Sequence, residues 1–380
     1  MRSRRDLSLG ALWLVVLSLL AAAPAAAKSP QSKPQACDFN DSHFHLTNYI
    51  QEGPPVADVL KLMGTRVCRS TLFGIPLQQQ WAYHETGDFA PTYYLEADAP
   101  LYYYSFTDAV IAMEYRSLPP ADRDRFDPMI TGFNPADMYA ADHVRRVLTL
   151  FPGVFSGIGE FSVHKEFVST KIAGGGASLT DPALDRLLDF AGQAGLVVIL
   201  HNDIVRPFTK QAKVRPYFEQ LTALYARHPN TTIIWAHLGL GRVVQPVKGH
   251  AAYLEEILAN PAMRNIYFDL SWDELAKYIV ASDGALTVAA NLINKYPDRF
   301  LFGTDVVAPR KPEQYFGVYE MYAPLWARLT PDAREKVLKG NYVRLFDEGR
   351  RRVRAWERAN VPVAATGVSE PSLRQGGYTR

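Results

Sequence analysis

Short apolar runs alternate with amphipathic stretches along the chain from residue 126 onward. Each run is rich in β-branched and aromatic residues, and the following stretch repeats apolar residues at three- and four-residue spacing. This pattern predicts strands that alternate with helices, which is typical of parallel sheets. The predicted strands of this part are 126–133, 153–161, 196–201, 231–237, 265–270 and 299–305.

Two earlier segments extend the pattern to eight strands. They are DFNDSHFH at 38–45 and TRVCRSTLF at 65–73. We therefore predict an α/β fold, a (β/α)8 TIM barrel over residues 36–348, with a doubly wound open sheet as the alternative. No glycine-rich phosphate-binding motif follows the first strand, which weakens the alternative.

Two segments depart from the repeat. Residues 74–125 form an expanded loop after strand 2 and contain the tyrosine-rich stretch YYLEADAPLYYYSF (93–106). This insertion would either wall a substrate pocket or pack as a small subdomain, and we expect the second. Residues 350–380 begin with the basic run RRRVRAWER, for which we expect a frayed helix and then a disordered tail.

The first 27 residues have the pattern of a signal peptide. A basic start precedes an apolar stretch at 11–23 and small residues that end in AAAK. SRRDL at 3–7 resembles a twin-arginine export signal, and a general secretory signal is the alternative. We expect cleavage near Ala27, no stable membrane insertion afterwards, and a periplasmic or secreted protein.

Charge and composition narrow the choice of partners. The formal charge of the chain is +2, and three arginines of the first 27 residues supply it, so the mature chain would be close to neutral. No electrostatic argument therefore favours nucleic acid as a partner. We expect a small-molecule substrate, and the oligomeric state stays open. Cys37 and Cys68 would form either one disulfide or two buried thiols.

Polar residues stand at the ends of several predicted strands. His43 and His45 are two residues apart in the first strand, so their side chains would project the same way. The later strand ends carry Glu160, His201, His237, Asp269 and Asp305.

The fold would gather these side chains, because strand ends converge at one mouth of a β/α barrel. Imidazoles and carboxylates are ligands for zinc, manganese or iron. The sequence therefore predicts a site for one or two divalent ions, zinc by preference. The expected ligands are His43, His45, Glu160, His201, His237 and Asp305.

The ordered motifs resemble the amidohydrolase superfamily, specifically its amidohydrolase-related branch, over roughly residues 38–348. The matching elements are DSHFH, GIGEF, VVILHND, IIWAHLG, LFGTD and VLKGNYVRLF. The resemblance implies a barrel that binds one or two divalent metals and usually performs hydrolysis.

Residue by residue, the resemblance implies roles for these side chains. His43, His45 and His201 would bind metal. Asp305 would be both a ligand and the proton carrier, and His237 a second-metal ligand or an electrophilic aid. Glu160 stands where many relatives have a carbamylated lysine, as in the branch that resembles TatD-type hydrolases, and would bridge two ions.

We therefore expect a hydrolase in which metal-activated water cleaves an amide, ester or lactone bond. One alternative is a metal-dependent non-oxidative decarboxylase of the aminocarboxymuconate-semialdehyde type. Arg206 and Arg310 are then candidates for binding the substrate carboxylate, although both also suit plain surface positions. An alternative of another class is a non-catalytic exported barrel that binds a ligand. No motif identifies the substrate.

Overall fold

The computed structural model describes residues 37–362, and eight parallel strands form one sheet within them. The predicted signal peptide and residues 363–380 of the predicted tail lie outside the described residues. In sheet order the strands are β1 (Phe39–Asp41), β3 (Val67–Leu72), β6 (Phe126–Ile130), β7 (Gly157–His164), β8 (Val197–Asn202), β9 (Ile233–Trp235), β10 (Ile266–Leu270) and β11 (Phe300–Phe302).

The sheet closes on itself between its first and last strands. Ser42 N donates to Phe302 O at 3.0 Å, and Asp305 N donates to His43 O at 2.7 Å. Beyond these bonds, β2 (Phe44–His45) pairs in parallel with β12 (Val306–Val307). The predicted barrel is thus confirmed, and the open-sheet alternative is wrong.

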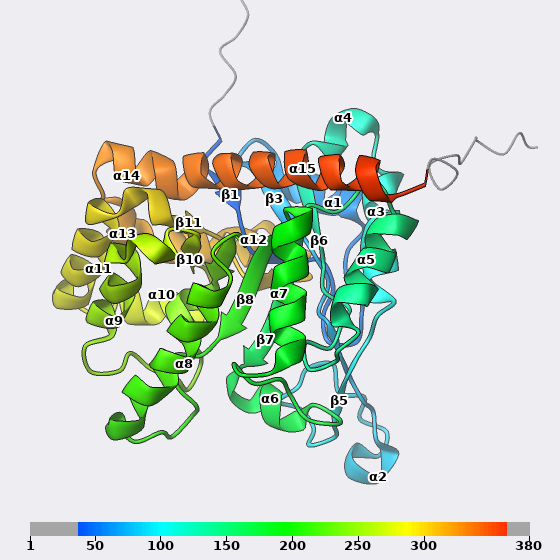
Figure 1. Ribbon diagram of the computed structural model, residues 1–380, viewed down its shortest axis with the longest axis horizontal. Coiled ribbons are helices and arrows are strands. Elements are labelled where there is room, and N and C mark those ends of the chain that lie inside the picture. The colour runs from blue at the N-terminus through cyan, green and yellow to red at the C-terminus, as the bar shows by residue number, and fades with distance from the viewer. Residues whose placement is uncertain (1–36, 363–380) are drawn as a thin grey trace, which may run out of the picture. The chain divides into compact units, whose positions relative to one another are not determined.

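Helices follow the strands and cover the outside of the barrel (Figure 1). The longer ones are α1 (Val56–Met63), α3 (Thr107–Ser117), α5 (Ala140–Leu150), α7 (Pro182–Ala194), α8 (Val214–Arg227), α9 (His250–Ala259), α11 (Asp283–Lys295), α12 (Pro312–Met321) and α15 (Asn341–Asn360). The shorter ones are α2 (Tyr83–Thr86), α4 (Pro120–Arg123), α6 (Glu166–Lys171), α10 (Asp273–Ile279), α13 (Ala323–Trp326) and α14 (Pro331–Glu335). None of the helices within residues 37–362 is long and apolar enough to cross a membrane.

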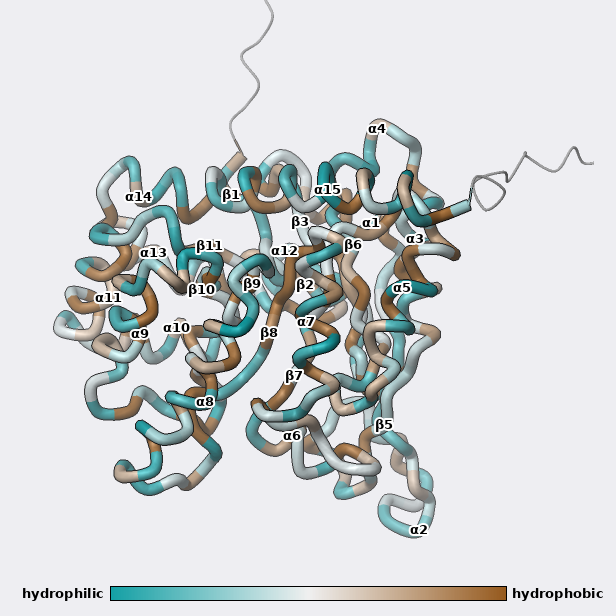
Figure 2. The backbone as a smooth tube through the Cα atoms, in the orientation of Figure 1, coloured by the Kyte–Doolittle hydropathy of each residue, from teal (hydrophilic) through white to brown (hydrophobic). Residues whose placement is uncertain are grey.

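Local sequence explains where the elements begin and end. At the start of α7, the Asp181 side chain accepts a hydrogen bond from Ala183 N and Pro182 takes the first helical position. Gly195 ends the helix in the left-handed conformation, with φ of 80°. The strand that follows, β8, is hydrophobic along most of its length (Figure 2), as a strand covered on both faces must be.

The insertion after β3 is packed around its tyrosines. β4 (Leu77–Gln79) and β5 (Leu101–Tyr103) pair antiparallel. Tyr49, Tyr94 and Leu101 form an apolar cluster with Val168 and Ile172 of α6 and its C-terminal end. The sequence placed the end of the insertion at residue 125, which is too late, because α3 is the barrel helix that packs on β6.

Helix α15 lies across the end of the barrel at which the strands begin, and the arrowheads of β7 and β8 point away from it (Figure 1). Tyr342, Leu345 and Phe346 from this helix join the apolar cluster inside the barrel. The prediction of a frayed helix from residue 350 is wrong for residues 350–360, where Val353 is fully buried and Arg354 pairs with Glu357.

The two cysteines form a disulfide. It joins Cys37, which precedes β1, to Cys68 in β3, and their Cα atoms are 5.5 Å apart. This separation is normal for a disulfide, and the bond ties the start of the barrel to its neighbouring strand.

A buried carboxylate attaches α15 to the barrel. Asp127 of β6 has no exposed surface and accepts hydrogen bonds from Arg69 Nη2 at 2.9 Å, Tyr342 Oη at 2.7 Å and Arg350 Nε at 2.5 Å. Its charge therefore holds together β3, β6 and α15.

Asp127→Asn should lower the free energy of unfolding by roughly 3 kcal/mol, because two arginines lose their shared counter-ion. Urea denaturation measures this change. Asp124→Asn is the matched control, because Asp124 is exposed and lies 3.6 Å from Arg350 Nη1, and it should change stability by less than about 0.5 kcal/mol. Equal stability of the two variants would contradict the role of Asp127.

Candidate metal centre

The six predicted ligands lie together at the end of the barrel where the strands finish. Two groups of them present ligand atoms within 4.8 Å of one another. The first group is His43, His45, Glu160 and Asp305, and the second is Glu160, His201 and His237. All are buried except for a small part of Asp305, so the two groups form one enclosed polar cluster that shares Glu160.

The two carboxylate oxygens of Glu160 face different groups. Oε2 is 3.4 Å from His45 Nε2 and 3.7 Å from His43 Nε2. Oε1 is 2.6 Å from His201 Nδ1 and 3.7 Å from His237 Nε2. One carboxylate therefore stands between two sets of imidazoles.

An irregularity in β7 aims Glu160 at this position. Glu160 lies inside β7, where the register with β8 shifts between Ile158 and Phe161. A side chain on the preceding Gly159, which has φ of 108°, would place its Cβ 2.2 Å from Ile199 O. Only glycine allows this close approach of the two strands, and such irregularities commonly redirect side chains beside active sites.

His237 and Asp305 lie just after the ends of their strands, because β9 and β11 are shorter than the sequence predicted. His237 follows β9 with φ of 54°, and Asp305 follows β11 with φ of 53°. Residues other than glycine rarely adopt this backbone conformation, and those that do are found preferentially at functional sites. The backbone bond from Asp305 N to His43 O holds Asp305 against the first strand segment.

The chain bends just before the HxH segment. β1 ends at Asp41 and β2 begins at Phe44, and the bend between them is at Ser42. The Asp41 carboxylate fixes this bend, because it accepts hydrogen bonds from His43 N at 3.1 Å, Thr304 N at 2.8 Å and Thr304 Oγ1 at 2.7 Å. The imidazoles of His43 and His45 still reach the same cluster, with ring centroids 5.3 Å apart.

Outer hydrogen bonds orient three of the imidazoles. His43 Nδ1 is 2.8 Å from Asp269 Oδ2, and His201 Nε2 is 3.1 Å from Asp203 Oδ1. Ser271 Oγ donates to Asp269, so it accepts from His237 Nδ1, which is 2.8 Å away. The other ring nitrogens point at the shared cluster.

These orientations fit a metal. Nε2 of His43 and Nε2 of His237 are buried and have no hydrogen-bond partner among the described residues. Buried polar atoms normally have partners, and metal-binding histidines normally donate their second ring nitrogen to a carboxylate or hydroxyl. Asp203 and Ser271 were not predicted from the sequence, and Asp269 was predicted at a strand end but without a role. Their signal was the two-residue spacing in HND and DLS, which repeats the spacing of HxH.

The electrostatics keep the carboxylates charged. Burial alone would raise the pKa of Glu160, yet the charge of Lys165 and the hydrogen bond with His201 lower it well below its usual value. The pKa of Asp305 is also lowered, because the charge of His43 and the hydrogen bond with His45 outweigh burial. The pKa of His237 is lowered because burial disfavours the charged imidazole.

The two predicted substrate-binding arginines are not part of this cluster. Arg206 and Arg310 are exposed, and neither forms an ion pair with a described residue. Arg310 lines a cavity of about 390 Å³ with Glu52 and Glu114, and none of the six ligands lines that cavity.

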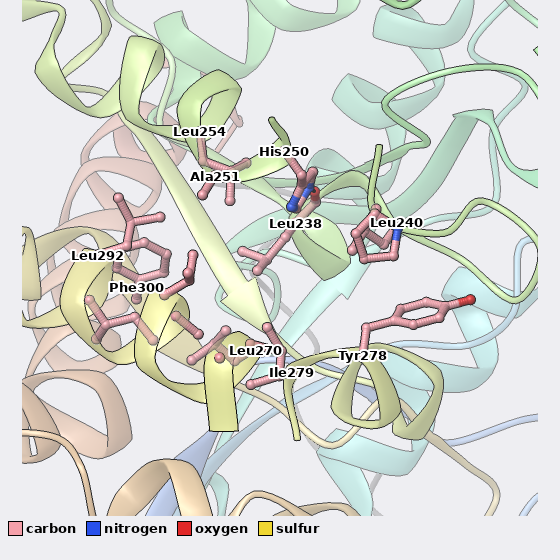
Figure 3. A pocket seen from close by; sticks show the side chains of 16 residues that line it. Leu238, Leu240, His250, Ala251, Leu254, Leu270, Tyr278, Ile279, Leu292 and Phe300 are labelled. Carbon is pink, nitrogen blue, oxygen red and sulfur yellow. The ribbon is translucent and has the colours of Figure 1, made fainter. Parts of the chain in front are cut away.

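A separate apolar pocket of about 240 Å³ lies beside the barrel, between helices α9 and α11 (Figure 3). Leu238, Leu254, Leu292 and Phe300 are among the side chains that line it. None of the six candidate ligands contributes to its wall, so this pocket is distinct from the metal centre.

Comparison with known proteins identifies the family. The amidohydrolase family model matches residues 41–347. The chain belongs to the amidohydrolase family. This amidohydrolase is therefore an enzyme of the metal-dependent hydrolase type, as the motifs predicted, and its His, Glu and Asp cluster can bind a metal. No curated protein matches the sequence significantly.

Several solved structures are similar to this amidohydrolase. An amidohydrolase from Burkholderia multivorans with bound zinc has 13% identity and a TM-score of 0.49, covering 81% of this chain and 99% of that one. Dihydroorotase from Campylobacter jejuni has 12% identity and a TM-score of 0.47, covering 82% and 83%. 5-Carboxyvanillate decarboxylase from Sphingomonas paucimobilis has 16% identity and a TM-score of 0.39, covering 64% and 71%.

Asp269→Asn should weaken zinc binding by about 10- to 100-fold, because the amide nitrogen cannot accept a hydrogen bond, and Asp269 accepts one from the His43 ring and one from the backbone N–H of His237. Competition with a chromogenic chelator measures the affinity. Asp273→Asn is the control, because Asp273 is half-exposed and pairs with Lys277 outside the cluster. Unchanged zinc affinity in a folded Asp269→Asn protein would show that this orienting bond is unimportant.

Proposed function

We propose that this amidohydrolase uses two divalent ions, zinc by preference, to hydrolyse an amide, ester or lactone bond of a small molecule. The observation that carries the proposal is the position of Glu160, whose two oxygens face two different sets of imidazoles. A carboxylate placed in this way suits a bridge between two ions, without a modified lysine.

The chain offers each ion its own ligands. His43, His45 and Asp305 would hold the first ion with Glu160 Oε2, and His201 and His237 would hold the second with Glu160 Oε1. When bound, such ions lower the pKa of water from ~15.7 to ~7 and polarise a carbonyl group.

Asp305 is the best-placed proton carrier. Its Oδ1 lies 3.0 Å from His45 Nε2 and 3.3 Å from His43 Nε2, and its side chain keeps 8% of its surface exposed while the histidines keep 1% or less. It can therefore reach both the nucleophilic water and an incoming substrate. We propose that the Asp305 carboxylate accepts a proton from the water and then donates it to the leaving group.

Two alternatives are less well supported. A decarboxylase with a single ion would need only one of the two groups, and it would leave the second pair of histidines without a purpose. A non-catalytic binding barrel would have no need of a carboxylate in the position of Asp305. Export to the periplasm or medium, expected from residues 1–27, remains part of the proposal.

Removal of metal should abolish hydrolysis. A screen of lactones, esters and N-acyl compounds identifies a substrate, and dialysis against a chelator should then reduce turnover to background, with zinc or manganese restoring it. Carbon dioxide release is measured in the same samples. Turnover that survives chelation, or carbon dioxide as the product, would contradict the proposal.

Asp305→Asn should lower kcat by about 10²- to 10⁴-fold, because the amide cannot accept the proton of water. Zinc content, measured by elemental analysis, separates loss of the proton carrier from loss of metal. Asp298→Asn is the control, because Asp298 is exposed and pairs with Lys336 outside the cluster. A kcat that stays within twofold of wild type in zinc-loaded Asp305→Asn would rule out the role.

A further inference from the structure

A buried lysine stands at the edge of the metal centre. Lys165 lies between β7 and α6, its side chain is only 10% exposed, and its Nζ is 3.3 Å from Glu160 Oε1. An ammonium group has three donors, and Glu160 is the only hydrogen-bond acceptor of Nζ among the described residues. Lysines are rarely buried without fuller pairing, so Lys165 has donors to offer to another anion.

Glu160, the hydrogen-bond partner of Lys165, also contacts the histidines of the metal centre. Glu160 Oε1 is also 2.6 Å from His201 Nδ1, and the same carboxylate is the shared ligand of both groups. Bound metal ions would neutralise the negative charge of Glu160, and the ammonium group of Lys165 would then lack a counter-ion. An anionic group of the substrate would restore the balance.

The indole ring of Trp272 lies next to this ammonium. Its ring centroid is 5.6 Å from Lys165 Nζ and 5.1 Å from the ring of His237. The backbone of Trp272 has φ of 75°, which is strained for a large side chain and is kept where the surroundings require it. A substrate here would meet an aromatic face and a positive charge side by side.

Lys165 and Asp305 are the most exposed of the charged groups at this centre. The side chains of Lys165 and Asp305 are 10% and 8% exposed, against 3% for Glu160 and 1% or less for the histidines. The ammonium and the proposed proton carrier are therefore more accessible to an incoming molecule than the histidines are.

We propose that Lys165 binds a carboxylate of the substrate, while Trp272 packs against the apolar part of the same molecule. This inference rests on the proposed function and narrows its substrate class to amides, esters or lactones with a carboxylate close to the bond that is cleaved. A single ammonium suits a carboxylate, whereas phosphate is usually held by several donors or by arginine. The site thus uses Lys165 instead of Arg206 or Arg310.

The test compares a charged probe with its neutral isostere. Benzoate and benzamide are titrated into the zinc-loaded full chain by calorimetry. The wild-type protein should bind benzoate at least tenfold more tightly than benzamide. Lys165→Met should weaken benzoate binding by about 10- to 100-fold, because a charged hydrogen bond is lost, and should change benzamide binding by less than twofold.

Two further variants sharpen the comparison. Lys165→Gln keeps a hydrogen-bond donor without the charge and should show the same selective loss, which keeps the test valid if the Met variant folds poorly. Lys61→Met is the matched control, because Lys61 is exposed on α1 and pairs with Asp58, and both affinities should stay within twofold of wild type.

Four results would overturn the assignment of Lys165. They are equal wild-type affinities for the two probes, an unchanged benzoate affinity in the Lys165 variants, an equal loss for benzamide, and a selective loss of benzoate in Arg206→Met or Arg310→Met instead. Failure of the proposed function is distinct, because it would appear as absent hydrolysis by the wild-type protein and would leave the probe comparison valid.

Discussion

The arrangement of the metal centre depends on the buried carboxylate of Glu160, which contacts four imidazoles. A buried carboxylate is costly unless every oxygen has partners, and each oxygen of Glu160 faces a different pair of imidazoles. Those imidazoles come from segments far apart in the chain. They meet only because the sheet closes, as the contact between His45 and Asp305 across 260 residues shows. Closure of the barrel and assembly of the site are therefore one event.

The two ends of the barrel have different roles, one in stability and the other in the metal centre. At the end where the strands begin, α15 fills the interior with apolar side chains and is attached through the buried charge of Asp127. At the other end, His237, Trp272 and Asp305 hold strained backbone conformations. TIM barrels commonly separate stability and function in this way. The packed end, where the strands begin, supports strained backbone conformations at the functional end, where the strands finish.

Much of this architecture could be predicted from the sequence. Apolar runs indicated six of the strands, two earlier segments completed the eight, and polar residues at strand ends indicated all six residues that meet in the cluster. The features that were missed depend on contacts across the fold. Asp203 and Ser271 orient imidazoles, and only their two-residue spacing from His201 and Asp269 marks them in the sequence. Lys165 reaches Glu160 from the loop that follows β7, and no pattern marks it. The end of α15 was mistaken for a frayed helix because its arginines, which look solvated in the sequence, bond to the barrel.

The most direct test of the account locates the ions in a crystal of the zinc-loaded protein by anomalous diffraction at the zinc edge. The account predicts two peaks, one next to His43, His45 and Asp305 and the other next to His201 and His237, with the Glu160 carboxylate between them. A single peak, or ions that do not contact Glu160, would contradict it.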